Sequence, residues 1–338
     1  VFDRSDGNPF FVEELLCCRA EYHRSMPASL RDVLFARVDA LAEGPQRLLG
    51  VAAVGGREVE HEMLMAVAGR SGVEADVGAL VEAGLLVPTR APDGDDAYSF
   101  RHALVQEAVY DAMLPTERRR LHRSWGEYLS DHQQETAAGL VQLAHHWREA
   151  RDPRALAASI AAGNGAMASY SYEAAAREFG EALLLWRDDD EAEPGTDHVD
   201  LLERHARAAY LASDFRTAQA SCHEALEELG DTDPARRTTL LVLLGRSQWV
   251  NGDWGPATDT YELALETSPS EPPIVRVRAL AGLGQAYMLN ARHRDARPLL
   301  EAAIEGARAI GARDVEGHAL NSLSAVLASL GETEEGAA

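Results

Sequence analysis

The sequence predicts a mainly α protein that begins with a small helical domain and continues as stacked helical repeats. Apolar residues recur at helical spacing through most of the 338 residues, and 46% of all residues are hydrophobic. Two short apolar runs around Asp93-Gly94 interrupt that pattern, as a β-hairpin would. Small residues then return at regular intervals after residue 151. A chain of this length holds two or three domains, and we divide it into residues 1–26, 27–115, 116–150 and 151–338.

Residues 1–26 are expected to form a helical remnant of a larger domain, and residues 27–115 a compact domain of helices and a hairpin. The spacing of apolar residues predicts helices at Pro27–Leu41, Gln46–Val54, Glu60–Ala68 and Val73–Ala83. Gly84 ends the last of these helices, and the hairpin strands are expected at residues 85–88 and 97–100. Short helices followed by a hairpin have the order of a winged helix. The predicted fold is therefore a small winged-helix domain followed by an α-α superhelix.

Winged helices often bind DNA, but the charge of this chain argues against that role. The helix before the hairpin carries Glu74, Asp76 and Glu82 and neither Arg nor Lys. The whole chain has 32 basic side chains, all of them Arg, against 55 acidic ones, and a formal net charge of −23. Such a surface repels phosphate backbones and anionic membranes. We therefore expect no nucleic acid and no membrane partner through this segment.

Residues 101–150 are predicted to form helices at 102–113, from Arg118 onward and at 139–149. His145, His146 and Glu149 allow a metal interpretation, but two ligands one helical turn apart do not make a site, so a packed helix is favoured. The arginines at 118–120 follow Glu117, which favours ion pairs within the chain over an acidic partner or nucleic acid.

Residues 151–338 are repetitive. Each repeat has a small residue, an alanine twelve positions later, a larger residue four further on and another alanine three beyond that. The first small residues are Gly163, Ala206, Gly245 and Gly284, and the larger residues are Phe179, Cys222, Tyr261 and Leu300. This pattern resembles that of tetratricopeptide repeats, in which small residues let paired helices approach closely. A fifth unit is expected near residues 318–323, with its turn at Gly331.

Several chemical functions are not supported by the sequence. The run from Gly50 to Gly56 imitates half a P-loop, but Arg57-Glu58 follows where Lys and Ser or Thr are required, so a helix end is expected there. We find no catalytic triad and no zinc motif, and we predict no catalytic residue and no metal ligand. Three cysteines, no signal peptide and no long apolar run favour a cytoplasmic location.

Two motifs carry a resemblance to a known family. Gly7-Asn8-Pro9 opens the helical segment Phe10-Phe11-Val12-Glu13-Glu14-Leu15-Leu16, and Tyr98-Ser99-Phe100-Arg101-His102-Ala103 follows far downstream. In this order they resemble regulatory ATPases of the STAND class, which includes the MalT-like and LuxR-family large ATP-binding regulators. The resemblance implies that residues 1–26 are the end of a nucleotide-binding region and that the chain is a C-terminal fragment.

The resemblance also implies a site for ATP or ADP. Pro9 would pack near the adenine, with Gly7 and Asn8 shaping the turn; the alternative is a turn and helix cap without a ligand. His102 would contact the β-phosphate, and Arg101 is a second candidate for a phosphate contact. The family triplet Met-His-Asp reads Arg-His-Ala here, so His102 is also compatible with a capping role alone. Magnesium would be bound mainly by a missing N-terminal part.

The family resemblance predicts the nucleotide-sensing and signal-binding portion of an ATP-dependent switch, which at full length would be a transcriptional regulator and a slow ATPase. A protein or small-molecule signal would bind the repeats, activation would cause self-association, and DNA would bind a missing C-terminal domain. The alternatives are a tetratricopeptide scaffold without nucleotide control and a regulatory module fused to a nucleotide cyclase or kinase. A P-loop motif encoded upstream of Val1 would favour the switch over the scaffold.

Overall fold

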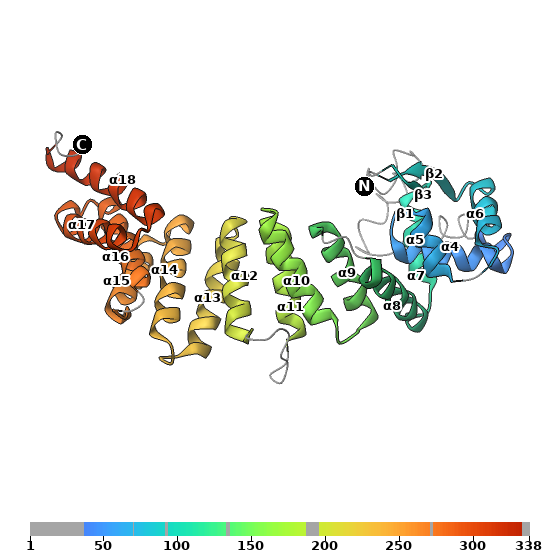
Figure 1. Cartoon of the computed structure of the whole chain (residues 1–338), viewed down its shortest axis with the longest axis horizontal. Coiled ribbons are helices and arrows are strands. Elements are labelled where there is room, and N and C mark those ends of the chain that lie inside the picture. The colour runs from blue at the N-terminus through green and yellow to red at the C-terminus, as the bar shows by residue number, and fades with distance from the viewer. Residues whose placement is uncertain are drawn as a thin grey trace, which may run out of the picture. The chain divides into compact units, whose positions relative to one another are not determined.

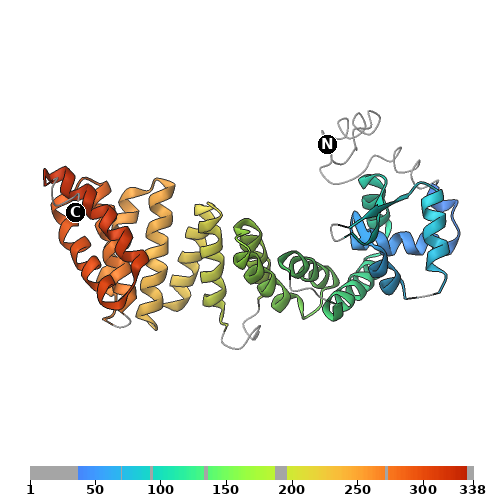
Figure 2. The same ribbon diagram turned by 45° about the horizontal axis from the view of Figure 1, so that its top comes forward.

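The computed structural model describes residues 37–69, 71–91, 94–132, 136–186, 196–270 and 273–332. The chain divides into two compact units, Val1–Ala158 and Ser159–Ala338, and each is described by itself. Figures 1 and 2 show a mainly helical molecule whose strands belong to the first unit. Gly7, Asn8 and Pro9, the expected helical remnant and nearly all of the helix predicted from Pro27 lie outside the described residues.

The first unit begins with the element order of a winged helix. Its elements are α4 (Glu43–Gly55), β1 (Glu58–Glu60), α5 (His61–Ala68), α6 (Val73–Glu82), β2 (Leu86–Arg90) and β3 (Asp96–Phe100). The strands form one antiparallel sheet in the order β1-β3-β2, and β3 pairs with both neighbours so that Tyr98 lies opposite Val59 and Pro88. The predicted hairpin is confirmed. Strand β1 was not predicted, because three residues are too few to show an alternating pattern.

Local sequence explains where these elements end. Helix α4 stops at Gly55, and Gly56 follows with φ of 123°, a backbone conformation that glycine adopts readily. The glycines that imitate a P-loop are therefore a helix end, as expected. The apolar faces of α4, α5, α6 and the sheet meet in one core, in which Leu49, Leu64 and Leu80 are completely buried.

Three helices complete the first unit: α7 (Ala103–Ala112), α8 (Pro115–His132) and α9 (Ala137–Ala150). The prediction that a helix opens at Arg118 was wrong by one turn, since α8 begins at Pro115. Proline is well tolerated in a first turn, where its missing N–H leaves no hydrogen bond unmade. Helix α9 begins after Thr136, whose Oγ1 accepts a hydrogen bond of 3.1 Å from the amide of Gly139.

The second unit is a stack of helical hairpins. Its helices are α10 (Ala155–Ala168), α11 (Tyr172–Leu185), α12 (His198–Leu211), α13 (Phe215–Leu229), α14 (Pro234–Asn251), α15 (Trp254–Thr267), α16 (Pro273–Leu289), α17 (His293–Ile310) and α18 (Arg313–Leu330). Neighbouring helices in the chain pack on one another from α11 to α18, and α16 also contacts α14 and α18. Aspartates 197, 214 and 233 cap helices with their side chains, which fixes where α12, α13 and α14 begin.

The repeat positions found in the sequence form the contacts inside each hairpin. In the four repeats, the residues at the other three positions of the pattern are all buried, being at most 4% exposed. They are the alanines at 175, 182, 218, 225, 257, 264, 296 and 303 together with Phe179, Cys222, Tyr261 and Leu300. A β-carbon on Gly163 would lie 2.5 Å from the ring of Phe179, and one on Gly284 would lie 2.7 Å from Leu300. The small residue therefore makes room for the larger one, and the chain contains a tetratricopeptide-like repeat domain.

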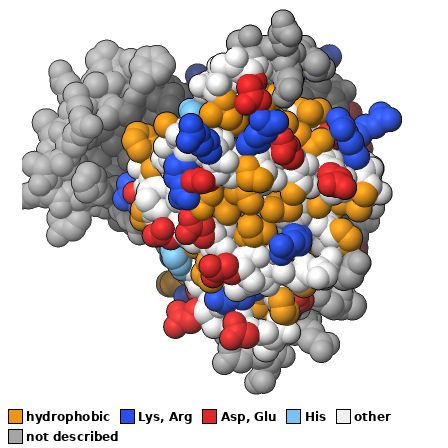
Figure 3. Space-filling model, turned by 90° about the vertical axis from the view of Figure 1, so that its left-hand side faces the viewer, with side chains coloured by type: hydrophobic (Ala, Val, Ile, Leu, Met, Phe, Trp, Pro, Cys, Tyr) orange, Lys and Arg blue, Asp and Glu red, His pale blue; other side chains and the backbone are white. Residues whose placement is uncertain are grey.

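Helices α17 and α18 form one end of the stack. Helix α18 packs inward with Val315, Ala319 and Val326, which are buried, and it leaves Leu320 41% exposed. Seen from this end, hydrophobic side chains gather between charged ones, without a deep hollow (Figure 3). Among the described residues, no helix is long and apolar enough to cross a membrane.

Candidate functional site

The structure places His102 and Arg101 at the junction between β3 and α7. His102 is the N-cap residue of α7, with extended backbone, but its half-buried imidazole makes no capping hydrogen bond to that helix. The amide of Arg101 donates a hydrogen bond of 3.0 Å to the carbonyl of Leu85, and its side chain is exposed. Because Gly7, Asn8 and Pro9 lie outside the described residues, the nucleotide site stays a prediction.

The histidines at the end of α9 take part in a packed cluster. The Nδ1 atoms of His122 and His146 share a hydrogen bond of 2.9 Å, and Tyr110 bonds to Nε2 of His122 at 2.9 Å. The His146 ring stacks on Trp125 with an interplanar angle of 14°. Burial, and then the neighbouring histidines, lowers the pKa of His122 to about 4 and that of His146 to about 3. Both rings are therefore neutral at pH 7.

This cluster favours the packed-helix interpretation of His145-His146. Within the described ranges, no group of three or more His, Cys, Asp or Glu residues is arranged to hold a metal ion. Both ring nitrogens of His122 take part in hydrogen bonds, one with His146 and one with Tyr110. We therefore look for a ligand site elsewhere, in the repeats.

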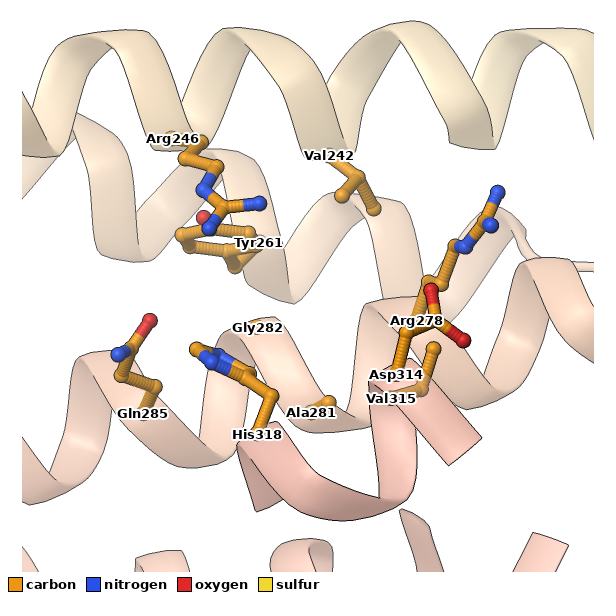
Figure 4. A pocket seen from close by; sticks show the side chains of 10 residues that line it. All are labelled: Val242, Arg246, Tyr261, Arg278, Ala281, Gly282, Gln285, Asp314, Val315 and His318. Carbon is orange, nitrogen blue, oxygen red and sulfur yellow. The ribbon is translucent and has the colours of Figure 1, made fainter. Parts of the chain in front are cut away.

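A hollow in the repeats lies between α14, α16 and α18, and we call it the groove cavity. It has a volume of about 360 Å³. Figure 4 shows its side chains projecting from three successive hairpins into one space. The lining residues are Val242, Arg246, Tyr261, Arg278, Ala281, Gly282, Gln285, Asp314, Val315 and His318. Pockets that bind small ligands have volumes of about 300–1,000 Å³, so the groove cavity lies at the lower end of that range.

The polar groups of the groove cavity are separated by an apolar floor. Arg246 and Tyr261 face Gln285 and His318 at one end, and Arg278 lies with Asp314 at the other end (Figure 4). Val242, Ala281 and Gly282 lie between these ends, and Val315 lies beside Asp314 (Figure 4). A bound molecule would therefore be held by charge at its ends and by packing in its middle.

Both arginines of the groove cavity lack an acidic partner among the described residues, since no carboxylate oxygen lies within 4.0 Å of either guanidinium. Some other arginines of the repeats are paired, for example Arg236 with Asp197 and Arg292 with Asp295. Burial lowers the pKa of His318, and the charge of Arg246 lowers it further. The groove cavity is thus a locally positive place in a chain of net charge −23.

A second, smaller hollow of about 180 Å³ adjoins the first, and we call it the side pocket. It shares Arg246, Tyr261, Gly282 and Gln285 with the groove cavity, and it adds Tyr210, Trp249, Val250, Ala286 and Leu289. Val250 and Leu289 are 50% and 49% exposed, although both are large and apolar. The guanidinium of Arg246 also lies 5.7 Å from the centre of the Tyr210 ring. The side pocket therefore offers an aromatic and aliphatic surface next to a cation.

Most residues of these hollows were missed in the sequence, where only Tyr261 was singled out. A usable signal was present. Arg207, Arg246 and Gln285 each directly follow the small residue of their repeat, and Arg246 and Gln285 line both hollows. Residues one position after the small residue lie on the same side of successive first helices. A comparison of this position among the repeats would therefore have found Arg246 and Gln285.

The known proteins that resemble this chain do so at low sequence identity or over a small part of their length. No protein-family model matches the chain. An uncharacterized protein of Rhizobium meliloti (strain 1021) is 32% identical over 136 residues, which cover 35% of this chain and 13% of that protein. The chain therefore spans a small fraction of the length of this curated relative.

Three solved structures are similar to the chain at low sequence identity. One is a Signal Transduction ATPase with Numerous Domains (STAND) protein with a tetratricopeptide repeat sensor from Pyrococcus horikoshii, with 14% identity, a TM-score of 0.38 and coverage of 99% of this chain and 61% of that one. Aspartyl phosphate phosphatase F from Bacillus subtilis has 13% identity, a TM-score of 0.47 and coverage of 66% and 67%. YrrB, a repeat protein with an unusual peptide-binding site, has 20% identity, a TM-score of 0.38 and coverage of 57% and 91%. These values are too low to assign a family or a function.

Proposed function

We propose that this chain is the partner-binding portion of a regulatory switch protein and that a peptide segment of its partner binds in the groove cavity and side pocket. The observation that carries this proposal is the pair of adjoining hollows, which share Arg246, Tyr261, Gly282 and Gln285. Together they form a path across α14 and α16. A small rigid ligand would fill one hollow, whereas an extended peptide places successive side chains in neighbouring ones.

A matched pair of variants tests this proposal. Peptides are selected from a displayed library of random heptapeptides with the wild-type chain, and their affinities are measured by fluorescence anisotropy. Gln285→Trp fills the space shared by both hollows and should weaken binding at least about tenfold, because the peptide and the indole cannot occupy it together. Leu320→Trp changes the exposed face of α18 and should leave the affinity unchanged. Selection of no peptide, or equal binding by both variants, would contradict the proposal.

The motif resemblance extends the proposal to nucleotide control. ADP would lie between a nucleotide-binding domain and the first unit, with Gly7, Asn8 and Pro9 near the adenine and His102 and Arg101 near the phosphates. The first turn of α7 contains no acidic residue, so its backbone amides and helix dipole favour an anion beside His102. Magnesium would be held by residues of the nucleotide-binding domain. The switch would regulate transcription through a further DNA-binding domain.

Release of labelled ADP tests this extension in a protein that carries a P-loop domain ahead of residue 1. His102→Ala should release ADP several-fold faster than wild type, since the imidazole donates to phosphate only in the bound state. His132→Ala removes an exposed histidine at the end of α8 and serves as the matched control. Equal release by the two variants would favour a scaffold without nucleotide control, and would leave peptide binding by the repeats unaffected.

A further inference from the structure

We infer that the repeats select peptides in which an acidic side chain lies next to a large apolar one. The carboxylate would bind Arg246 and Arg278 in the groove cavity, and the apolar side chain would bind the side pocket. This inference rests on the proposed peptide-binding function and gives that function a specificity.

The carboxylate preference follows from the two arginines. Arg246 on α14 and Arg278 on α16 both line the groove cavity, and within the described part of the chain neither has a carboxylate at ion-pairing distance. A guanidinium offers five donors in a fixed fork, which matches the two oxygens of a carboxylate. Two unpaired guanidinium groups facing one hollow are an arrangement that a bound anion stabilises.

Neighbouring polar groups strengthen this preference. His318 on α18 lies close enough to Arg246 that the two groups repel each other when both are charged. Gln285 adds an amide that donates hydrogen bonds and lies on the same side of the cavity as His318 (Figure 4). The single acidic residue of the lining, Asp314, lies at the far end beside Arg278. A basic side chain would therefore meet repulsion at Arg246 and at Arg278.

The apolar preference follows from the side pocket. Trp249, Val250 and Leu289 line it, and two of these are about half exposed although burial would stabilise them. The indole of Trp254 lies 6.2 Å from that of Trp249 and is itself 59% exposed, which extends the same surface. Because Arg246 belongs to both hollows, an acidic and an apolar side chain can be bound only when they are close together in the peptide.

A positional-scanning library tests the inference. Heptapeptides with acetylated N-termini and amidated C-termini are incubated with the full chain, so that only side chains supply carboxylates. The wild type should enrich Asp or Glu at one position and Leu, Phe or Trp at an adjacent one. Arg246→Gln together with Arg278→Gln should lose the acidic preference and retain the apolar one. For a selected acidic peptide we expect a loss of affinity of at least about tenfold.

Arg276→Gln is the matched control. Arg276 lies on α16 two residues from Arg278, but it bonds to Ser268 and does not line either hollow. This variant should keep both preferences, with affinity within about twofold of wild type. Selection of peptides without an acidic preference would overturn this inference alone. Selection of no peptide by the wild type would overturn the proposed peptide binding as well. A second library has free C-termini. If peptides are selected from it only because of their terminal carboxylate, the repeats recognise a chain end and not an acidic side chain, and the stated specificity is overturned.

Discussion

Gly282 lies so close to Tyr261 that a β-carbon on the glycine would be 2.5 Å from Cε1 of the ring. The phenol ring is 4% exposed and fills the space between the small residue of its own repeat, Gly245, and Gly282 on the next first helix. Burial also raises the pKa of Tyr261. The contact explains how α14, α15 and α16 pack around the two hollows, since both residues line them.

Gly282→Ala should therefore destabilise the repeats and change the shape of the groove cavity. Moving the buried ring aside costs about 1–3 kcal/mol, which exceeds the gain of up to about 1 kcal/mol from replacing glycine in a helix. We expect a lower free energy of unfolding in urea and weaker binding of a selected peptide. Gly317→Ala is the control, because Gly317 lies within α18 with no atom within 4 Å of its β-carbon position. That variant should be equally or more stable than wild type; equal losses in both would contradict the packing argument.

The neutral histidine cluster predicts acid sensitivity of α8 and α9. The pKa values of His122 and His146 fall from 6.5 to about 4 and about 3 on folding, because burial penalises the charged rings. Between about pH 6.5 and 4 the unfolded chain therefore binds more protons than the folded one, and stability falls as the pH drops through that window. We expect the free energy of opening of these helices, measured by amide hydrogen exchange, to fall by about 4 kcal/mol from pH 7.5 to pH 5.

His146→Phe keeps an aromatic ring against Trp125 and removes one of the two titrating groups. The variant should be less stable at pH 7.5, because His122 loses its 2.9 Å hydrogen-bond partner. Its stability should nevertheless depend less steeply on pH below 6.5. If the pH dependence of α8 and α9 were as steep in this variant as in wild type, the cluster would not be the source of acid sensitivity.

The thiol of Cys222 should react only when the repeats unfold, so its labelling measures their opening. It occupies the larger-residue position of its hairpin, is completely buried, and burial raises its pKa to about 12. The thiolate that reacts with alkylating agents is therefore scarce and shielded. In a Cys17→Ser/Cys18→Ser background, iodoacetamide should label Cys222 only in denaturant concentrations that unfold α12 and α13. Rapid labelling in native buffer would contradict the burial of this position.

The sequence predicted the framework of the repeats better than their recognition surface. Buried positions such as Gly163 and Phe179 recur because the close approach of two helices admits few residue types, so a single sequence reveals them. Arg246, Arg278 and His318 line one hollow although they are far apart in sequence, and only the stacking of three hairpins brings them together. Strand β1 escaped prediction for a similar reason, because Val59 becomes a strand residue through its pairing with Tyr98.

The last prediction concerns Arg236, which belongs to an ion-pair cluster that joins the start of α14 to α12. Its guanidinium donates to both carboxylate oxygens of Asp197 at 2.9 Å and to Glu203 at 2.6 Å. The guanidinium lowers the pKa of Asp197, whereas burial raises the pKa of Glu203 in spite of the same partner. Glu203 lies deeper, being 27% exposed against 62% for Asp197, so its charge depends more on Arg236.

Arg236→Met should lower the free energy of unfolding by about 2 kcal/mol, because it leaves the carboxylate of Glu203 half-buried without a cation. Adding Glu203→Gln to this variant should recover about half of the loss, since an amide carries no charge to desolvate. Urea denaturation of the two single variants and the double variant forms a thermodynamic cycle that isolates this coupling. Arg47→Met breaks a surface pair with Glu43 on α4, in which the two side chains are 56% and 80% exposed, and should change stability by less than about 1 kcal/mol. Equal effects of Arg236→Met and Arg47→Met would show that the depth of Glu203 does not matter, and that the cluster joins α12 to α14 no more firmly than an ordinary surface pair.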